Sequence, residues 1–159
     1  MTEIGSIPLY RDERLRDREL GCSISTQPPA SWPAILTKPS RRLRLGKFYH
    51  RPPGGESWAD VALRLRGVLG DMNVEHDGEK VILFTHEALI FPARYVFEGL
   101  TEPELMTLAH STELANCSVT SYVRSEHGDL HLVDFNAADI LHEHGARPTV
   151  EPGVHAEPT

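Results

Sequence analysis

A histidine and an acid directly follow a short apolar run in the middle of the chain. The run is Val81–Phe84, and the polar residues after it are Thr85, His86 and Glu87. Four bulky or β-branched residues are too few for an ordinary helix, so the pattern predicts a central strand buried on both faces of a parallel sheet. Open α/β sheets bind ligands just beyond the carboxyl ends of their strands. His86 is therefore a candidate catalytic or phosphate-binding group, with an ordinary hydrogen-bonded residue at a strand end as the alternative.

A second acid, Glu56, follows a rigid turn. The stretch Arg51–Ser57 reads Arg-Pro-Pro-Gly-Gly-Glu-Ser, which delivers Glu56 to the amino end of a predicted helix. A carboxyl at this place complements the helix dipole, which is the structural alternative to any functional role. Arg51 is a weaker candidate for a contact with an anionic substrate.

The composition excludes several classes of protein. A chain of 159 residues with 40% apolar and 25% charged residues has room for one globular domain. Its net charge of −7 argues against general nucleic-acid binding. Two cysteines make neither a disulfide framework nor a metal knuckle, and no apolar run approaches membrane-spanning length. We expect a cytoplasmic protein with no nucleic-acid or membrane partner.

The charges are unevenly distributed along the chain. Between Leu20 and Gly55 there is no Asp or Glu, and this gap holds six basic residues: Lys38, Arg41, Arg42, Arg44, Lys47 and Arg51. A basic segment beside a His/Glu site suits an anionic small substrate, whereas the alternative is a solvated basic surface.

The remaining pattern predicts the elements that position these residues. Ser57 and Asp60 resemble a capping box that opens a helix with one apolar face, to about Asn73. Thr101 and Glu104 form a second capping box, which opens a helix to about His110. The other predicted elements are a short strand at Ile7–Tyr10, a helix at Ala88–Phe97, and strands at Cys117–Arg124 and Leu130–Phe135 joined by a turn at residues 126–129. Gly21–Ser40 is predicted as an irregular loop because it holds four prolines and has no apolar period.

Four stretches, taken in chain order, resemble the histidine phosphatase superfamily, the phosphoglycerate-mutase-like group. They are the acidic-basic segment from Asp12 that ends in Gly21, the Pro-Gly-Gly-Glu-Ser turn with its helix, the apolar strand ending in His86, and the strand start at Asn116–Thr120. The resemblance implies an α/β fold, a three-layer α/β/α sandwich. We expect a partial domain of this type over residues 1–145 and a flexible tail over residues 146–159.

The resemblance also implies a mechanism. In that family a histidine attacks phosphorus, positive groups and a second histidine neutralise the phosphoryl group, and a carboxylic acid protonates the leaving oxygen. His86 then corresponds to the second, phosphate-binding histidine and Glu56 to the proton donor. Glu87 replaces a glycine common after this histidine and is a second candidate for the donor. Arg51, Glu87 and Asn116 are the candidate substrate contacts.

One family motif is absent from the chain. The nucleophile of the family lies in an Arg-His-Gly tripeptide, and these 159 residues contain none. We therefore expect an N-terminally incomplete domain of a phosphomonoester phosphatase or mutase, acting on a phosphorylated small molecule. The alternative is an inactive remnant that binds a phosphorylated ligand or a partner. No cofactor and no metal are expected, because His142 and His144 share no helical face and no Cys/His quartet exists.

Overall fold

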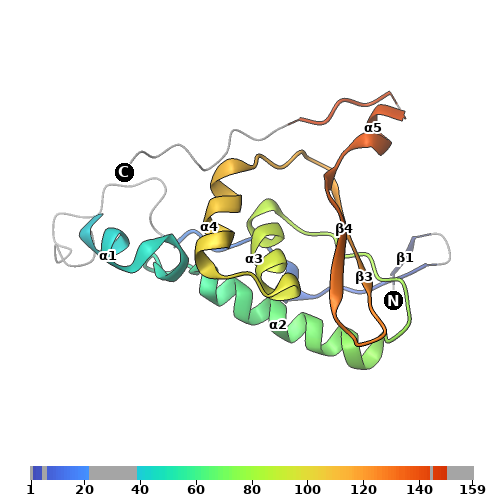
Figure 1. The fold of residues 1–159 in the computed structure, drawn as a ribbon, viewed down its shortest axis with the longest axis horizontal. Coiled ribbons are helices and arrows are strands. Elements are labelled where there is room, and N and C mark those ends of the chain that lie inside the picture. The colour runs from blue at the N-terminus through green and yellow to red at the C-terminus, as the bar shows by residue number, and fades with distance from the viewer. Residues whose placement is uncertain (1, 5–6, 22–38, 144, 150–159) are drawn as a thin grey trace. The chain divides into compact units, whose positions relative to one another are not determined.

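The computed structural model of the chain describes residues 2–4, 7–21, 39–143 and 145–149. Its elements, most of which are labelled in Figure 1, fall into two compact units, Met1–Pro92 and Ala93–Thr159. Most of the predicted Gly21–Ser40 loop and of the predicted tail lies outside the described residues. The single domain over residues 1–145 stays a prediction.

The first unit begins with two short strands. β1 (Thr2–Ile4) and β2 (Ile7–Leu9) pair antiparallel, with Thr2 opposite Leu9. This pairing confirms the strand predicted at Ile7–Tyr10. A 3-10 turn, η1 (Glu13–Leu15), follows, with Asp12 as its amino-terminal cap. α1 (Pro39–Tyr49) was not predicted from the sequence, and it is broken at Gly46, where φ is 70°.

The helix after the Pro/Gly turn is the main element of this unit. α2 spans Trp58–Glu75, and Ser57 and Asp60 form the predicted capping box at its start. The Asp60 N–H donates to the Ser57 hydroxyl over 3.2 Å, and the Ser57 N–H donates to the Asp60 carboxylate over 2.8 Å. These two bonds satisfy backbone donors that a helix start otherwise leaves unpaired. The predicted helix is confirmed.

The buried core of the first unit gathers along one face of α2. Five α2 residues are buried, as are apolar residues of α1 and of the start of α3 (Glu87–Glu98). The Trp58 and Phe91 rings stack with their centroids 6.3 Å apart. The buried residues on these three helices are Phe48, Trp58, Val61, Ala62, Leu65, Val68, Leu89, Phe91 and Pro92.

The prediction of a buried central strand at Val81–Phe84 is wrong in this structure. The segment forms no strand, and Ile82 and Phe84 are each 72% exposed. A strand is buried on both faces only when neighbouring strands and covering layers surround it. Among the described residues the strands form two antiparallel pairs, and Val81–Phe84 belongs to neither. The chain thus mixes helices with small antiparallel sheets, in keeping with the α/β class.

The second unit contains the rest of α3, a further helix and a hairpin. α4 (Glu102–Ser111) begins with the predicted Thr101–Glu104 capping box. β3 (Val119–Arg124) and β4 (Leu130–Ala137) pair antiparallel, which confirms both predicted strands. A short helix, α5 (Asp139–Glu143), follows β4.

A polar network joins α3 to β3 within the second unit. Arg94 donates to both carboxylate oxygens of Glu98, over 2.6 and 2.7 Å. The Tyr122 hydroxyl donates to the same carboxylate over 2.8 Å. Burial and the neighbouring carboxylate raise the pKa of Tyr122, so its hydroxyl stays protonated and keeps donating.

We predict that Leu65→Ala lowers the free energy of unfolding by about 3 kcal/mol, because Leu65 is 2% exposed and its truncation leaves a cavity. Leu63→Ala is the matched control on the same helix. Leu63 is 67% exposed, and its change should be within about 0.5 kcal/mol. Urea unfolding of both variants measures the difference, and equal losses would contradict the packing of α2 described here.

Candidate active site

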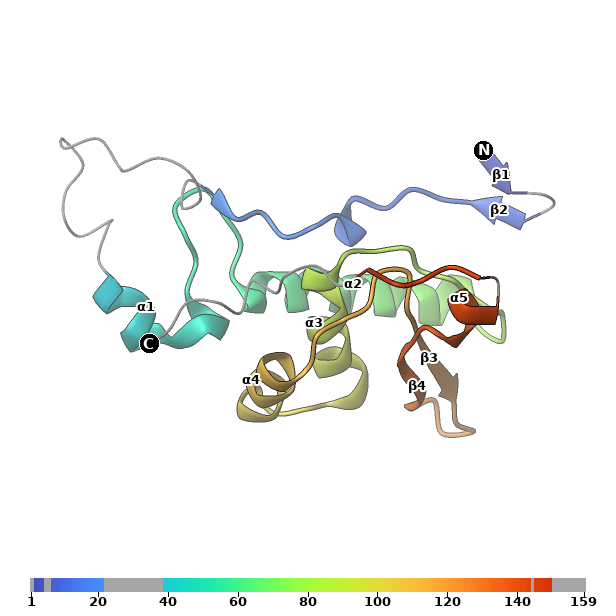
Figure 2. The same ribbon diagram turned by 90° about the horizontal axis from the view of Figure 1, so that it is seen from above.

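Glu56 lies where the turn before α2 meets the segment that precedes Gly21. The Glu56 N–H donates to the Glu19 carbonyl over 2.7 Å, and the Glu19 N–H donates to the Glu56 carboxylate over 3.1 Å. In Figure 2, residues 7–21 run along α2. The two chain segments therefore hold Glu56 through backbone as well as side-chain bonds.

Two glycines allow these segments to approach so closely. A Cβ atom on Gly55 would lie 2.7 Å from the Glu19 carbonyl oxygen and 2.9 Å from the Gly21 nitrogen. A Cβ atom on Gly21 would clash with the Pro53 carbonyl oxygen, and Gly21 also has a φ of 66°. Side chains are excluded at both positions, because the backbones themselves are in contact.

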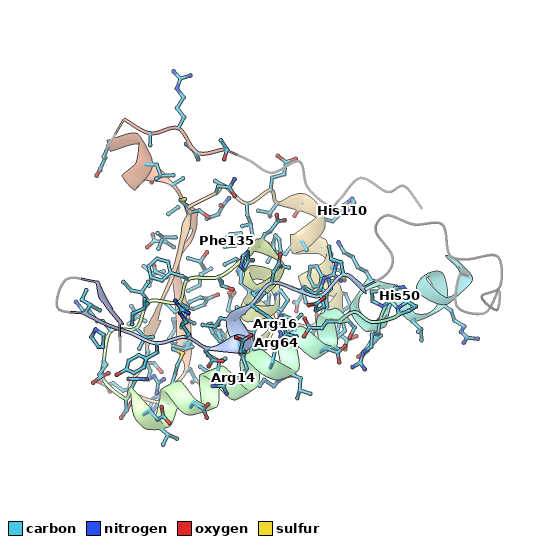
Figure 3. The ribbon with its side chains drawn as sticks, turned by 180° about the vertical axis from the view of Figure 1, so that it is seen from behind. Arg14, Arg16, His50, Arg64, His110 and Phe135 are labelled. Atoms are coloured by element: carbon cyan, nitrogen blue, oxygen red, sulfur yellow. The ribbon has the colours of Figure 1, made fainter. Side chains whose placement is uncertain are left out.

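Two arginines face the Glu56 carboxylate. The Arg64 guanidinium donates to both carboxylate oxygens, from Nε over 3.1 Å and from Nη2 over 3.2 Å. The Arg16 Nη2 donates to one of the same oxygens over 3.2 Å. Figure 3 shows Arg16 and Arg64 close to each other. We call the donors from Arg16, Arg64 and the Glu19 amide the arginine cradle.

The arginine cradle keeps the Glu56 carboxyl ionised. Burial favours the neutral acid, but the Glu19 N–H, the Arg64 guanidinium and the charge of Arg16 outweigh it and lower the pKa of Glu56. The side chains of Glu56 and Arg64 are only 16% and 10% exposed, so water screens this pair weakly. An ionised carboxylate can accept a proton from water, but it holds none to give to a leaving group.

A second set of ion pairs links the segment that precedes Gly21 to α2. Arg14 pairs with Asp12 over 2.6 Å and with Asp71 of α2 over 2.7 Å. Its carbonyl accepts a hydrogen bond from Nη1 of Arg64. Arg64 therefore binds the carboxylate of one segment and the backbone of the other, so its placement depends on both.

Arg51, the predicted substrate contact, is paired with an acid in the structure. Its guanidinium donates to both carboxylate oxygens of Asp60, from Nε over 2.7 Å to one oxygen and from Nη2 to the other. This pairing is the main cause that lowers the pKa of Asp60 to about 2. Because Asp60 also caps α2, the pair ties the turn to the helix that follows it.

His86 and Glu87 lie where the extended segment Val81–Phe84 passes into α3. His86 is exposed, its carbonyl accepts from the Leu89 N–H over 2.9 Å, and Glu87 is the first residue of α3. The preceding Thr85 hydroxyl donates to the Leu15 carbonyl over 3.0 Å. Leu15 is next to Arg16, so the chain before His86 and the arginine cradle meet the same short segment.

Asn116, the remaining predicted contact, belongs to the second unit. Its backbone N–H donates to the Thr149 carbonyl over 2.9 Å, and its side-chain amide donates to the Thr149 hydroxyl over 2.8 Å. These bonds tie together two loop segments of that unit.

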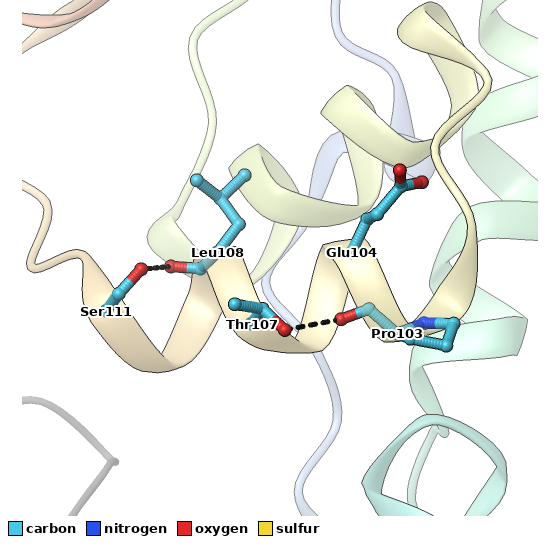
Figure 4. Close-up of a pocket in the computed structure, with 5 residues that line it drawn as sticks. All are labelled: Pro103, Glu104, Thr107, Leu108 and Ser111. Carbon is cyan, nitrogen blue, oxygen red and sulfur yellow. Dashed lines mark hydrogen bonds between the residues drawn. The ribbon is translucent and has the colours of Figure 1, made fainter.

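A shallow hollow on α4 offers no comparable chemistry (Figure 4). Its hydroxyl groups bond to the helix itself: Thr107 donates to the Pro103 carbonyl over 2.8 Å and Ser111 to the Leu108 carbonyl over 3.2 Å. Its one acid, Glu104, belongs to the capping box. The hollow is lined by no cation and does not suit a phosphate.

The described part of the chain has neither a cluster of metal ligands nor a helix suited to a membrane. Nowhere in residues 2–4, 7–21, 39–143 and 145–149 do three or more His, Cys, Asp or Glu side chains converge as metal ligands would. Over the same residues, no helix combines the length and the apolar character that crossing a bilayer requires. The arginine cradle is therefore the candidate site.

The sequence analysis did not single out Arg16 and Arg64. One signal pointed toward Arg16, since it lies in the acidic-basic segment before Gly21. Arg64 lies seven residues beyond Ser57, which is about two helical turns, so the two residues lie near the same face of the helix. Only the contact between the backbones at Gly21 and Gly55 brings both side chains to Glu56.

A half-buried carboxylate held by two arginines marks a place that could take a phosphate, because a guanidinium pairs with carboxylate and phosphate oxygens in the same two-bond geometry. The model of the histidine phosphatase superfamily (branch 1) matches residues 2–138. The chain therefore belongs to the histidine phosphatase superfamily, as its resemblance implied. Its family-level function is of the phosphatase and mutase type, on phosphorylated small molecules. No curated protein matched the chain.

We predict that Gly55→Ala destabilises the chain by about 2 kcal/mol, because the added methyl group must push apart two backbones in contact. Gly70→Ala is the matched control. Gly70 lies in α2 with open space around it, so alanine there should stabilise by up to about 1 kcal/mol. Urea unfolding distinguishes the two, and a neutral Gly55→Ala would mean that the segments do not cross here.

We also predict an acid-dependent loss of stability at Asp60. Its pKa is lowered from 3.8 to about 2 in the folded chain, first by the Arg51 hydrogen bond. A depressed pKa stabilises the fold above pH 3.8, and this contribution disappears as the pH falls from about 4 to about 2. Because Arg51 is exposed and solvent screens the pair, we expect about 1 kcal/mol.

Urea unfolding at several pH values tests this dependence. In Asp60→Asn the free energy of unfolding should change less between pH 4 and 2, since this variant lacks the titrating group. Asp129→Asn, in the exposed β3–β4 turn, is the control and should keep the original profile. A profile of Asp60→Asn that follows the original chain would contradict the pairing with Arg51.

Proposed function

We propose that this chain takes part in phosphoryl transfer from phosphomonoesters through a phosphohistidine mechanism, with Glu56 and His86 in its site. The match to the histidine phosphatase superfamily over residues 2–138 carries this proposal. The finer features expected from the family, a three-layer α/β/α sandwich that is incomplete at its amino end, belong to the proposal as well.

The charges around Glu56 support an anionic substrate. Arg16 and Arg64 present several N–H donors, and the planar fork of a guanidinium matches the oxygens of a phosphate. In the proposed site these cations and His86 neutralise the transferring phosphoryl group, which is mainly electrostatic catalysis. Arg51, Glu87 and Asn116 are proposed as further substrate contacts.

Two proton-transfer roles are proposed for Glu56. In its ionised state it activates the water that hydrolyses a phosphohistidine, and in its protonated state it donates to the leaving oxygen. The first role suits the carboxylate as the arginine cradle holds it. The second requires that Glu56 first takes up a proton, and Glu87 is the alternative donor.

The nucleophile is the missing part of this proposal. These residues contain no Arg-His-Gly tripeptide, and without a covalent nucleophile the difficult step is no longer divided into two easier ones. The absence of the tripeptide also favours a second candidate function, an inactive chain that binds phosphorylated ligands or a partner.

We predict that Met1–Thr159 hydrolyses an aryl phosphate no faster than a blank. The same chain extended at its amino end by the coding sequence before Met1 should gain turnover if that sequence supplies the nucleophile. In an active chain, His86→Ala should lower kcat by roughly 100-fold or more, because it removes a group that neutralises transition-state charge. His127→Ala, in an exposed turn of the second unit, is the control and should leave kcat unchanged.

The outcomes separate the two candidate functions. Turnover by Met1–Thr159 that His86→Ala abolishes would mean that the nucleophile is present and that His86 is misassigned. Phosphate binding without turnover in either chain would favour the inactive binding protein. Neither turnover nor phosphate binding in either chain would overturn both.

A further inference from the structure

The Glu56 carboxylate occupies donors that fit an external anion better than they fit Glu56. Two guanidinium groups face one carboxylate, so the cluster holds two positive charges against one negative charge. A phosphate monoester carries close to two negative charges near neutral pH and offers three oxygens in place of two. It would neutralise both arginines and keep every donor of the arginine cradle bonded.

The geometry allows such an exchange. Arg64 binds Glu56 with two parallel bonds from one side of its guanidinium, which is the arrangement that phosphates also accept. The Arg16 side chain is 44% exposed, so an anion from solvent can reach it. The Glu19 N–H is a backbone donor that does not move with a side chain and would serve either anion.

We propose that the arginine cradle is an anion site which the Glu56 carboxylate occupies when no substrate is bound. A phosphomonoester displaces this carboxylate, and Glu56 takes up one proton from solvent as it leaves the arginines. This inference rests on the proposed function and deepens it, because it links substrate binding to the proton that the leaving oxygen needs.

The direction of the proton uptake follows from the charges around Glu56. Arg16 from the amino-terminal segment and Arg64 from α2 bond to it. Arg51 of the turn, which is itself paired with Asp60, acts on it through its charge alone, and all three arginines favour the ionised form. A bound dianion cancels this positive field and adds a negative charge close to the carboxylate. Both changes raise the pKa of Glu56, so substrate binding converts a base into an acid.

The test is calorimetric titration with sulfate, which mimics a phosphate dianion but has no proton that titrates near neutrality. Titration in two buffers of different ionisation enthalpy gives the number of protons taken up on binding. The chain should take up more protons than Glu56→Gln, and its affinity should fall as the pH rises, since binding consumes a proton. The affinity of Glu56→Gln should depend less on pH.

The affinities of the two chains provide a second measure. Glu56→Gln removes the competing internal charge but keeps an acceptor for the Glu19 N–H, so it should bind sulfate roughly tenfold more tightly. Glu98→Gln is the matched control, because Glu98 binds Arg94 with the same two-bond geometry at 15% exposure. It should leave the sulfate affinity unchanged.

The possible results distinguish a failure of the anion exchange at Glu56 from a failure of the proposed function. Sulfate affinity and proton uptake that are the same in the original chain and in Glu56→Gln would overturn the exchange, while anion binding would still support the proposed function. An equal gain of affinity in Glu98→Gln would also overturn it, because any broken Arg–Glu pair would then suffice. No binding of sulfate or of phosphate by either chain would overturn the proposed function itself.

Discussion

The contact between two backbones at Gly21 and Gly55 is the constraint on which the candidate site depends. It places the Glu19 amide and carbonyl against Glu56, and it aligns the preceding residues with α2. Arg16 and Arg64 come from segments 48 residues apart, and they reach one carboxylate only because these segments meet. A Cβ atom at either glycine would overlap the facing backbone and force the two segments apart.

The ion pairs around this contact differ in what they contribute. The exposed Arg51–Asp60 and Arg14–Asp71 pairs are screened by water and add little stability. The Glu56–Arg64 pair is shielded, so its partners interact strongly, but their burial has a desolvation cost. Removing one partner would leave a charge that is poorly solvated. Such a pair contributes little net stability, but it fixes the positions of the charged groups. A binding site for a charged ligand needs charged groups in fixed positions.

The extended Val81–Phe84 segment shows how far local sequence can predict burial. Its residues suit a strand, and its end is anchored by the Thr85 hydroxyl on the Leu15 carbonyl. Yet a strand becomes part of a sheet only through hydrogen bonds to neighbours, and its side chains become buried only beneath other layers. In the described part of the chain neither is present for this segment, and Ile82 and Phe84 are exposed. Nothing in the four residues themselves could reveal this.

The sequence by itself determined the features that depend on neighbours along the chain. The capping boxes at Ser57 and Thr101, the apolar face of α2 and the β3–β4 hairpin were predicted, because caps, helical periodicity and tight turns involve residues a few positions apart. The motif order also indicated the family and singled out Glu56. α1 was missed, since its basic residues and Gly46 give no clear apolar period. Only the tertiary structure brought Arg16 and Arg64 to Glu56 and left Val81–Phe84 without a partner strand among the described residues, because these outcomes depend on contacts between residues far apart in sequence.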